Sequence, residues 1–151
     1  MAEKTYVVNA EGYRLGRLAS HVAKLLLKGH RVKIYNAEKA VITGTKSSIL
    51  EHYLMLRRRR QLTSHKKITV WYPTKAEAIL RYAVIRMLPR RKPKGLDAAK
   101  RLEVVRGGMQ PAGEVIEFQD AKLGKPVSRS GKFIRYITLE ELSNLLRGGR
   151  T

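Results

Sequence analysis

The sequence predicts an α/β fold around a parallel β-sheet. Residues 5–10 (TYVVNA) and 31–36 (RVKIYN) are short runs rich in β-branched and aromatic residues, and the segment between them has apolar residues at helical spacing. A strand, an amphipathic helix and a strand within about thirty residues form a βαβ unit, whose strands are parallel. Hydrophobic residues make up 43% of the 151-residue chain, enough for a core despite a formal net charge of +20. We therefore expect a single domain over residues 1–151.

The first helix is expected to follow a turn that contains Gly12 and Gly16. Its apolar face consists of leucine, alanine and valine side chains over residues 15–26, with basic and polar residues on the other side. Gly29 is typical of the residue that follows a helix C-terminus. Beyond the second strand, residues 39–43 (KAVIT) predict a third strand.

A second helix is predicted by a capping box, in which two side chains satisfy free backbone amides at a helix N-terminus. Ser48 and Glu51 have the required spacing, so the helix is expected to begin at Ser47 or Ser48 and to end in the arginine run over residues 57–60. For residues 67–72 (KITVWY), a short strand and an extended loop both fit the composition.

A third helix is predicted by a second capping box, Thr74 with Glu77, and by Pro89, which ends it. Residues 89–95 (PRRKPKG) are too charged and too rich in proline for regular structure, so we expect a loop there. A short helix is expected over residues 96–101.

The C-terminal third of the chain has weaker patterns. Residues 102–105 are apolar, and residues 114–133 predict no particular element. Thr138 and Glu141 form a third capping box, which predicts a helix with a leucine face that ends at Gly148.

The composition excludes several kinds of chemistry. The chain has no cysteine, so disulfides, thiolate metal sites and cysteine nucleophiles are excluded. No run approaches the roughly 18 apolar residues that span a bilayer, and the N-terminus lacks the apolar core of a signal peptide. The four histidines lack metal-site spacing, and no nucleophile motif or acid–base pair is evident. We expect a soluble intracellular protein with no catalytic residues, no metal and no cofactor.

The positive charge is concentrated in the middle of the sequence. Between Arg57 and Arg101 there are 15 basic residues and only two acidic ones, Glu77 and Asp97. Surfaces that only keep a protein soluble mix both signs, and these segments lack the apolar face of a membrane-surface helix, so we expect nucleic acid as the partner. The predicted RNA-binding residues are Arg57, Arg58, Arg59, Arg60, Lys66, Lys67, Arg86, Arg90, Arg91, Lys92, Lys94, Lys100 and Arg101.

Aromatic residues are few in this basic region. For Tyr53, Trp71, Tyr72 and Tyr82, stacking on exposed bases and packing in the core are both open. Aromatics are only 7% of the chain, so recognition of RNA backbone and shape is favoured over reading of bases. Neutralising residues 57–60 together is expected to cost much RNA affinity without unfolding the protein.

A possible phosphate site follows the expected third strand. Gly44, Thr45, Lys46 and Ser47 lie between this strand and a helix, as in a phosphate-binding loop. Both glycines of the complete P-loop motif are missing, so nucleotide hydrolysis is not expected. Free amides at a helix N-terminus beside a lysine suit one RNA phosphate, and an ordinary helix cap explains the same residues equally well.

Two long stretches resemble a known family. They are VVNAEGYRLGRLASHVAKLLLKGHRVKIYNAEKAVITG over residues 7–44 and IRMLPRRKPKGLDAAKRLEVV over residues 85–105. Both are similar to the most recognisable segments of the L13 family of large-subunit ribosomal proteins, and the C-terminal RYITLEELSNLL is compatible with it. The chain lacks the leading segment of bacterial members and the helical extension of eukaryotic ones, so the resemblance indicates an archaeal-type member.

The resemblance implies a three-layer α/β/α fold around a parallel sheet of about four strands, with basic loop and helix extensions. It also implies a structural role in the cytoplasmic ribosome, with binding to large-subunit ribosomal RNA, early subunit assembly and contacts to neighbouring ribosomal proteins. No membrane or small-molecule partner is expected. Two rivals remain: a DNA-compacting or regulatory nucleic-acid-binding protein outside the ribosome, and a nucleotide-binding enzyme that uses Lys46.

Overall fold

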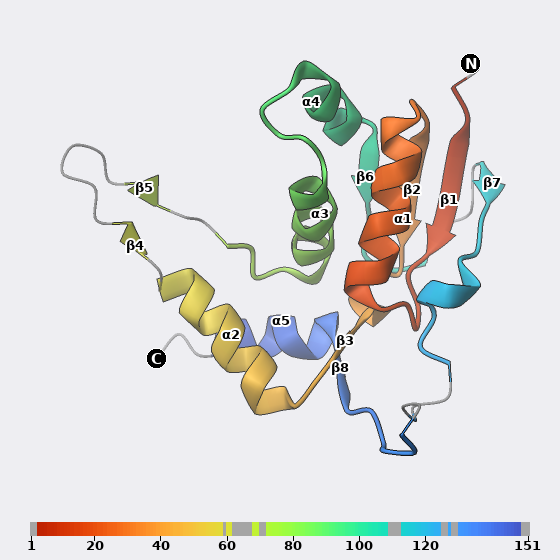
Figure 1. Ribbon diagram of the computed structural model, residues 1–151. Coiled ribbons are helices and arrows are strands. Elements are labelled where there is room, and N and C mark those ends of the chain that lie inside the picture. The colour runs from red at the N-terminus through yellow and green to blue at the C-terminus, as the bar shows by residue number, and fades with distance from the viewer. Residues whose placement is uncertain are drawn as a thin grey trace.

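The centre of the molecule is a parallel sheet with the strand order β6-β2-β1-β7 (Figure 1). Its strands are β1 (Thr5–Asn9), β2 (Arg31–Tyr35), β6 (Leu102–Val104) and β7 (Glu114–Val115). The structure is a computed structural model that describes residues 3–58, 60–61, 68–69, 72–108, 113–124, 127 and 130–148.

The predicted βαβ unit is confirmed as β1, α1 (Leu15–Leu27) and β2. The two strands pair in parallel with Val8 opposite Ile34, and both side chains are fully buried. The chain leaves α1 through Gly29, whose positive φ is easily adopted only by a residue without Cβ. Gly16, expected in the preceding turn, lies inside the first turn of α1.

Four more helices and two small sheets complete the described part of the chain. The helices are α2 (Lys46–Arg58), α3 (Ala76–Met87), α4 (Pro93–Lys100) and α5 (Leu139–Gly148), with 3-10 turns η1 (Ala37–Lys39) and η2 (Gln119–Ala121). The small sheets are antiparallel pairs of β3 (Val41–Thr43) with β8 (Tyr136–Thr138) and of β4 (Arg60–Gln61) with β5 (Ile68–Thr69). Strand β5 agrees with one of the two interpretations of residues 67–72, that of a short strand.

Helix packing creates the main core. α1 lies over the central sheet, α3 lies beside α1, and α5 packs against both α2 and α3 (Figure 1). α1 packs against α3, and Leu18, Val22 and Leu26 of α1 lie in one buried cluster with Leu80 and Val84 of α3; all five side chains are fully buried. The described residues form an α/β fold with a four-stranded parallel sheet and five α-helices, which confirms the predicted class and is consistent with three α/β/α layers.

The expected loop over residues 89–95 is shorter than predicted. α4 begins at Pro93, so residues 93–95 are helical. Proline is tolerated at the first helical position because its missing N–H would have no helical partner there, and the fixed φ suits the helix. The apolar run after the helix forms β6, which pairs in parallel with β2.

The capping box of α5 forms in part, whereas that of α2 does not. The backbone N–H of Glu141 donates to Thr138 Oγ1 at 3.3 Å, as predicted. α2 begins at Lys46, so Ser48 and Glu51 lie inside the helix. An ion pair of 2.6 Å between Lys46 Nζ and Glu141 Oε1 ties this start to α5.

The start of α3 is also set by tertiary packing. The N-cap is Lys75 rather than Thr74, and no side chain caps the helix. Ile79 N donates to Lys75 O at 2.9 Å, and Ala76 in the first turn is buried against the core. The predicted capping box of Thr74 with Glu77 is therefore wrong.

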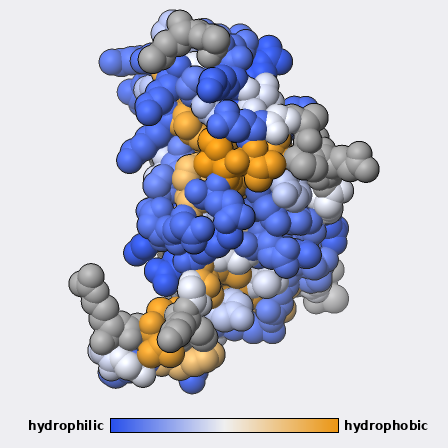
Figure 2. Space-filling model, turned by 90° about the vertical axis from the view of Figure 1, so that its right-hand side faces the viewer, coloured by the Kyte–Doolittle hydropathy of each residue, from blue (hydrophilic) through white to orange (hydrophobic). Residues whose placement is uncertain are grey.

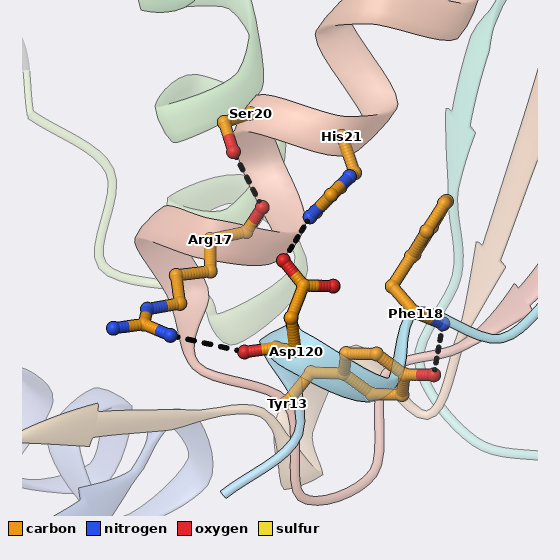
Figure 3. A network of polar contacts seen from close by, with 6 residues as sticks. All are labelled: Tyr13, Arg17, Ser20, His21, Phe118 and Asp120. Atoms are coloured by element: carbon orange, nitrogen blue, oxygen red, sulfur yellow. Dashed lines mark hydrogen bonds and ion pairs between the residues drawn. The ribbon is translucent and has the colours of Figure 1, made fainter.

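A polar network fastens the segment after β7 to the start of α1 (Figure 3). Phe118 N donates to Tyr13 Oη at 3.0 Å, and Arg17 Nη1 donates to the backbone oxygen of Asp120 at 3.1 Å. His21 Nε2 lies 2.9 Å from Asp120 Oδ2, and the imidazole stacks on the Phe118 ring with 4.6 Å between centroids. These partners are about a hundred residues apart in sequence, so local patterns did not predict the order of this segment.

The Asp120–His21 contact predicts a pH-dependent difference in stability. The hydrogen bond from His21 lowers the pKa of Asp120 below its ordinary value of 3.8, with a further electrostatic contribution from Arg17. A lowered folded-state pKa adds stability above the unfolded pKa, and this stability is lost as pH falls through the folded pKa. Asp120→Asn should therefore lower the melting temperature at about pH 5, and this difference should shrink as the pH is lowered toward about 2 through the folded-state pKa. Thermal denaturation across this range measures the difference, and an equal loss at both ends would contradict the contact.

Candidate nucleic-acid interface

The acidic side chains are largely neutralised within the fold. Among the described residues, nine ion pairs engage nine of the chain's twelve carboxylates. Five of these pairs lie on the central sheet or on loops beside its strands: Lys4–Glu114, Arg31–Glu3, Lys33–Glu103, Lys39–Glu11 and Lys122–Glu117. Within the described part of the stretch from Arg57 to Arg101, the only ion pair is Lys100–Asp97 at 3.2 Å. The excess charge is therefore concentrated away from the sheet.

The clearest cationic surface is the junction of α3 and α4. Arg90, Arg91, Lys92 and Lys94, hereafter the basic loop, are all exposed. Their side chains make no hydrogen bond or ion pair with the residues that the structure describes. These four cations are thus exposed and carry no counter-charge from the described residues, and phosphate binding by them remains a prediction.

The backbone of the basic loop is held in one conformation. Lys92 N donates to Pro89 O and Gly95 N donates to Lys92 O, each at 3.0 Å. Leu88, which precedes the loop, is buried in the core. A Cβ on Gly95 would lie 2.2 Å from Pro89 O and 2.6 Å from Pro89 C, so the start of α4 packs directly on this carbonyl. The cations therefore project from a fixed turn.

Two of the predicted RNA-binding arginines are committed to the fold. Arg57 is half-buried, and its Nη1 donates to the backbone oxygen of Leu146 in α5 at 3.2 Å. Arg101 is also half-buried, and its Nη2 donates to Leu26 O at the end of α1 at 2.9 Å. Arginines placed at helix C-termini satisfy carbonyls that lack helical partners and interact favourably with the helix dipole. Substitution of Arg57 is therefore expected to disturb α5 as well as charge.

Arg86 is exposed and lies against two aromatic rings. Its guanidinium lies 5.8 Å from the centroid of Tyr72 and 5.7 Å from that of Tyr82, and it donates to the Tyr72 hydroxyl. The two rings contact each other edge to face at 5.1 Å. Tyr53 is half-buried, and burial raises the pKa of its hydroxyl. These three tyrosines are thus engaged by the protein itself.

Several predicted residues fall outside this description. Arg59, Lys66, Lys67 and Trp71 lie outside the described residues, and so does the side chain of Arg60. Arg58 is exposed at the end of α2. Their role in RNA binding remains a prediction.

The structure adds three exposed cations that the sequence analysis did not select. Arg81 lies on α3, and Lys75 and Arg147 lie where α3 begins and α5 ends. Lys75 and Arg147 line a hollow of about 410 Å³ together with Thr74 and Leu146. Arg147 is far in sequence from the basic residues between Arg57 and Arg101, but it lines the same hollow as Lys75. Only the fold therefore reveals this grouping.

At the predicted phosphate site, the lysine is already paired with a carboxylate from another helix of the protein. Gly44, Thr45, Lys46 and Ser47 are exposed at the start of α2, as expected. The Lys46 ammonium is engaged by Glu141 at 2.6 Å, so its charge is already balanced. This pairing disfavours nucleotide binding through Lys46, and a phosphate contact at these residues remains a prediction.

Neither a metal-binding cluster nor a membrane-spanning helix occurs in the described part of the chain. No group of three or more potential metal-binding side chains occurs among these residues. No helix in this part is long and apolar enough to cross a membrane.

Comparison with known proteins decides the family. The family model described as Ribosomal protein L13 matches residues 3–111. The chain belongs to the ribosomal protein L13 family. It is 41% identical over 140 residues to large ribosomal subunit protein uL13 of Methanococcus maripaludis, covering 93% of this chain and 96% of the relative. It is 38% identical over 150 residues to large ribosomal subunit protein uL13 of Sulfurisphaera tokodaii, covering 98% of each.

Membership of the L13 family confirms the resemblance seen in the sequence, including its archaeal type. The matched residues run from β1 past β6 and include the basic loop. The stretch over residues 85–105 that carries the resemblance comprises the end of α3, the basic loop, α4 and β6. This segment therefore also contains the basic loop, whose turn is fixed by the close approach of Gly95 to Pro89.

Gly95→Ala should destabilise the protein even though alanine favours helices. Helix propensity favours alanine by about 1 kcal/mol, whereas overpacking against backbone costs about 1–3 kcal/mol. Because the added Cβ would meet the Pro89 carbonyl at 2.2 Å, the steric cost should prevail. Gly16→Ala in α1 is the matched control, since its Cβ would meet no atom within 4 Å and should stabilise the helix. Chemical denaturation of both variants measures this, and a Gly95→Ala variant as stable as Gly16→Ala would contradict the packing.

Proposed function

We propose that this chain is a structural constituent of the large ribosomal subunit, where it binds ribosomal RNA through the basic loop. The relatives of this L13 family member are named as proteins of the large subunit. Early participation in subunit assembly, contacts with neighbouring ribosomal proteins and a place in the cytoplasmic ribosome belong to the same proposal. It includes no catalytic role and no cofactor.

The observation that supports RNA binding is the unequal distribution of paired charge. The sheet side of the fold carries most of the ion pairs, whereas the basic loop presents four cations with no carboxylate partner among the described residues. Neighbouring like charges repel, so this surface favours a polyanion that brings its own negative charge. Phosphates bound there release condensed counterions, and this release supplies salt-dependent affinity.

Recognition at the basic loop is expected to be of backbone rather than base. Tyr72 and Tyr82, the aromatic residues described nearest to it in sequence, are engaged with Arg86 and with each other. Arginine and lysine contacts to phosphate fix position and orientation but carry no sequence information. The fixed turn reduces the entropy lost on binding, which favours a role in holding RNA segments close together.

The test replaces the four cations of the basic loop by glutamine: Arg90, Arg91, Lys92 and Lys94. Each lost phosphate contact should reduce the slope of log affinity against log salt by roughly 0.7–0.9. Four contacts would reduce it by about 3. Filter binding to a transcript of large-subunit ribosomal RNA over a range of salt concentrations measures both affinity and slope.

The matched control removes the same charge from the sheet side. Lys4, Lys33, Lys39 and Lys122 each make an ion pair, and their replacement by glutamine also changes the net charge by four. Exposed ion pairs contribute about 0–1 kcal/mol each, so the control should remain folded. We expect the control to keep most of the wild-type affinity and slope. Equal losses in both variants would refute the basic loop as the contact, and absence of RNA binding by the wild type would refute the function itself.

A further inference from the structure

A second cationic surface, with exposed aromatic rings, lies on the segment that enters β8. Phe133 is 69% exposed and Tyr136 is 48% exposed, and both are among the large hydrophobic side chains most accessible to solvent. The lower tip of the molecule in Figure 2, where the chain approaches β8 in Figure 1, shows hydrophobic atoms among hydrophilic ones. A globular protein gains by burying such rings, so their joint exposure on one short segment indicates an interaction surface.

The exposure of these rings is built into an ordered backbone. β8 pairs antiparallel with β3, with Tyr136 opposite Thr43 and Ile137 opposite Ile42. Ile137 is only 2% exposed, so alternation along the strand turns Tyr136 outward when Ile137 turns inward.

The backbone at and after Phe133 is also fixed by pairing with other segments. Phe133 forms an antiparallel bridge with Val127, and Gly44 N donates to Arg135 O at 2.8 Å. Tyr136 therefore projects from the paired strand β8 and Phe133 from a bridged position three residues before it, which lowers the entropy cost of binding through the two rings.

The sequence that leads to the rings carries charge of one sign. Between Asp120 and Glu140 the sequence has five basic residues and no acidic one: Lys122, Lys125, Arg129, Lys132 and Arg135. Lys132 and Arg135 are exposed on either side of Phe133. Aromatic rings interleaved with cations match single-stranded nucleic acid, because bases stack on the rings while cations hold the flanking phosphates. An acidic protein surface would match the cations, but it offers no flat partner for the rings.

We propose that residues 132–136 bind unpaired RNA bases, with Phe133 and Tyr136 each stacking on a base and Arg135 holding an adjacent phosphate. This inference rests on the proposed RNA-binding function and adds a contact of different chemistry. In Figure 1 the segment lies at the opposite end of the molecule from α4 and the basic loop. The protein thus has one end that reads backbone charge and one that holds exposed bases, and it connects two RNA segments. The segment also lies outside residues 3–111, which the family model matches.

The test compares single-stranded with duplex RNA, using the full chain. The variant Phe133→Leu with Tyr136→Leu keeps apolar side chains but removes both stacking faces. Its affinity for a single-stranded oligouridine of about 20 nucleotides should fall on the order of tenfold or more. Its affinity for an RNA duplex of the same length should change less than about twofold, because paired bases offer no face to the rings. The conservative variant Phe133→Tyr with Tyr136→Phe should bind as the wild type does.

The controls separate stacking from general effects. Val115→Ala shortens a side chain that is 53% exposed at the sheet edge, and it should leave the affinities for single-stranded and duplex RNA unchanged. Arg135→Gln should reduce the salt slope for the single strand by about 0.7, whereas the double leucine variant should leave the slope unchanged. Thermal denaturation should show similar melting temperatures for all of these variants, since each changed side chain lies at the surface.

The outcomes distinguish this inference from the proposed function. Wild-type binding of duplex RNA through the basic loop, combined with unchanged single-strand affinity in the double leucine variant, overturns the stacking site alone. Equal losses on single strand and duplex overturn it as well. Ultraviolet crosslinking of assembled large subunits should place residues 132–136 on RNA bases. Absence of this crosslink, together with a chemical crosslink from these residues to a ribosomal protein, would assign the surface to a protein partner.

Discussion

A shortage of carboxylates shapes this molecule more than any other single constraint. Thirty-two lysines and arginines share twelve acidic residues, so most cations have no counter-charge within the chain. The fold uses carboxylates where strands and helix starts bring charges together, as in Lys33–Glu103 on adjacent strands and Lys46–Glu141 between α2 and α5. The basic loop receives none from the described residues. Repulsion at that end is not relieved by carboxylates of the described residues, so the charge that folding leaves unbalanced is the charge on which the proposed RNA contact depends.

Cations differ in what they do even when the sequence places them in one run. Arg57 and Arg101 donate to backbone carbonyls at helix ends, and Arg86 is held by two tyrosines. Lys92 and its neighbours in the basic loop are exposed on a turn fixed by Gly95 against Pro89. Arginine suits the first task because its planar group reaches carbonyls while staying charged, and the fixed turn suits the second because phosphates find the cations already positioned. A count of basic residues therefore overestimates the number of phosphate contacts.

The parts of the fold that the sequence predicted are those determined by local patterns. The β1–α1–β2 unit and the leucine face of α5 follow from periodicity within a few turns. The parts it missed depend on distant contacts: β3 pairs with β8, and the segment around Asp120 is ordered by α1. The predicted starts of α2 and α3 were wrong for the same reason. Tertiary contacts of Lys46 and Ala76 outweighed the capping residues, which contribute about 1 kcal/mol.

The distinction between local patterns and distant contacts also explains which parts of the candidate nucleic-acid interface could be predicted from the sequence. A dense run such as residues 90–94 is visible in the sequence, and the structure leaves its cations exposed. The surface around Phe133 and Tyr136 could not be predicted because the basic residues of this part of the sequence are widely spaced. An aromatic residue in a sequence also does not show whether it is buried. Only the pairing of β8 with β3 decides that Ile137 turns inward and Tyr136 outward. Exposure of a ring beside cations is thus a property of strand register, and a shift of one residue would bury Tyr136 and expose Ile137.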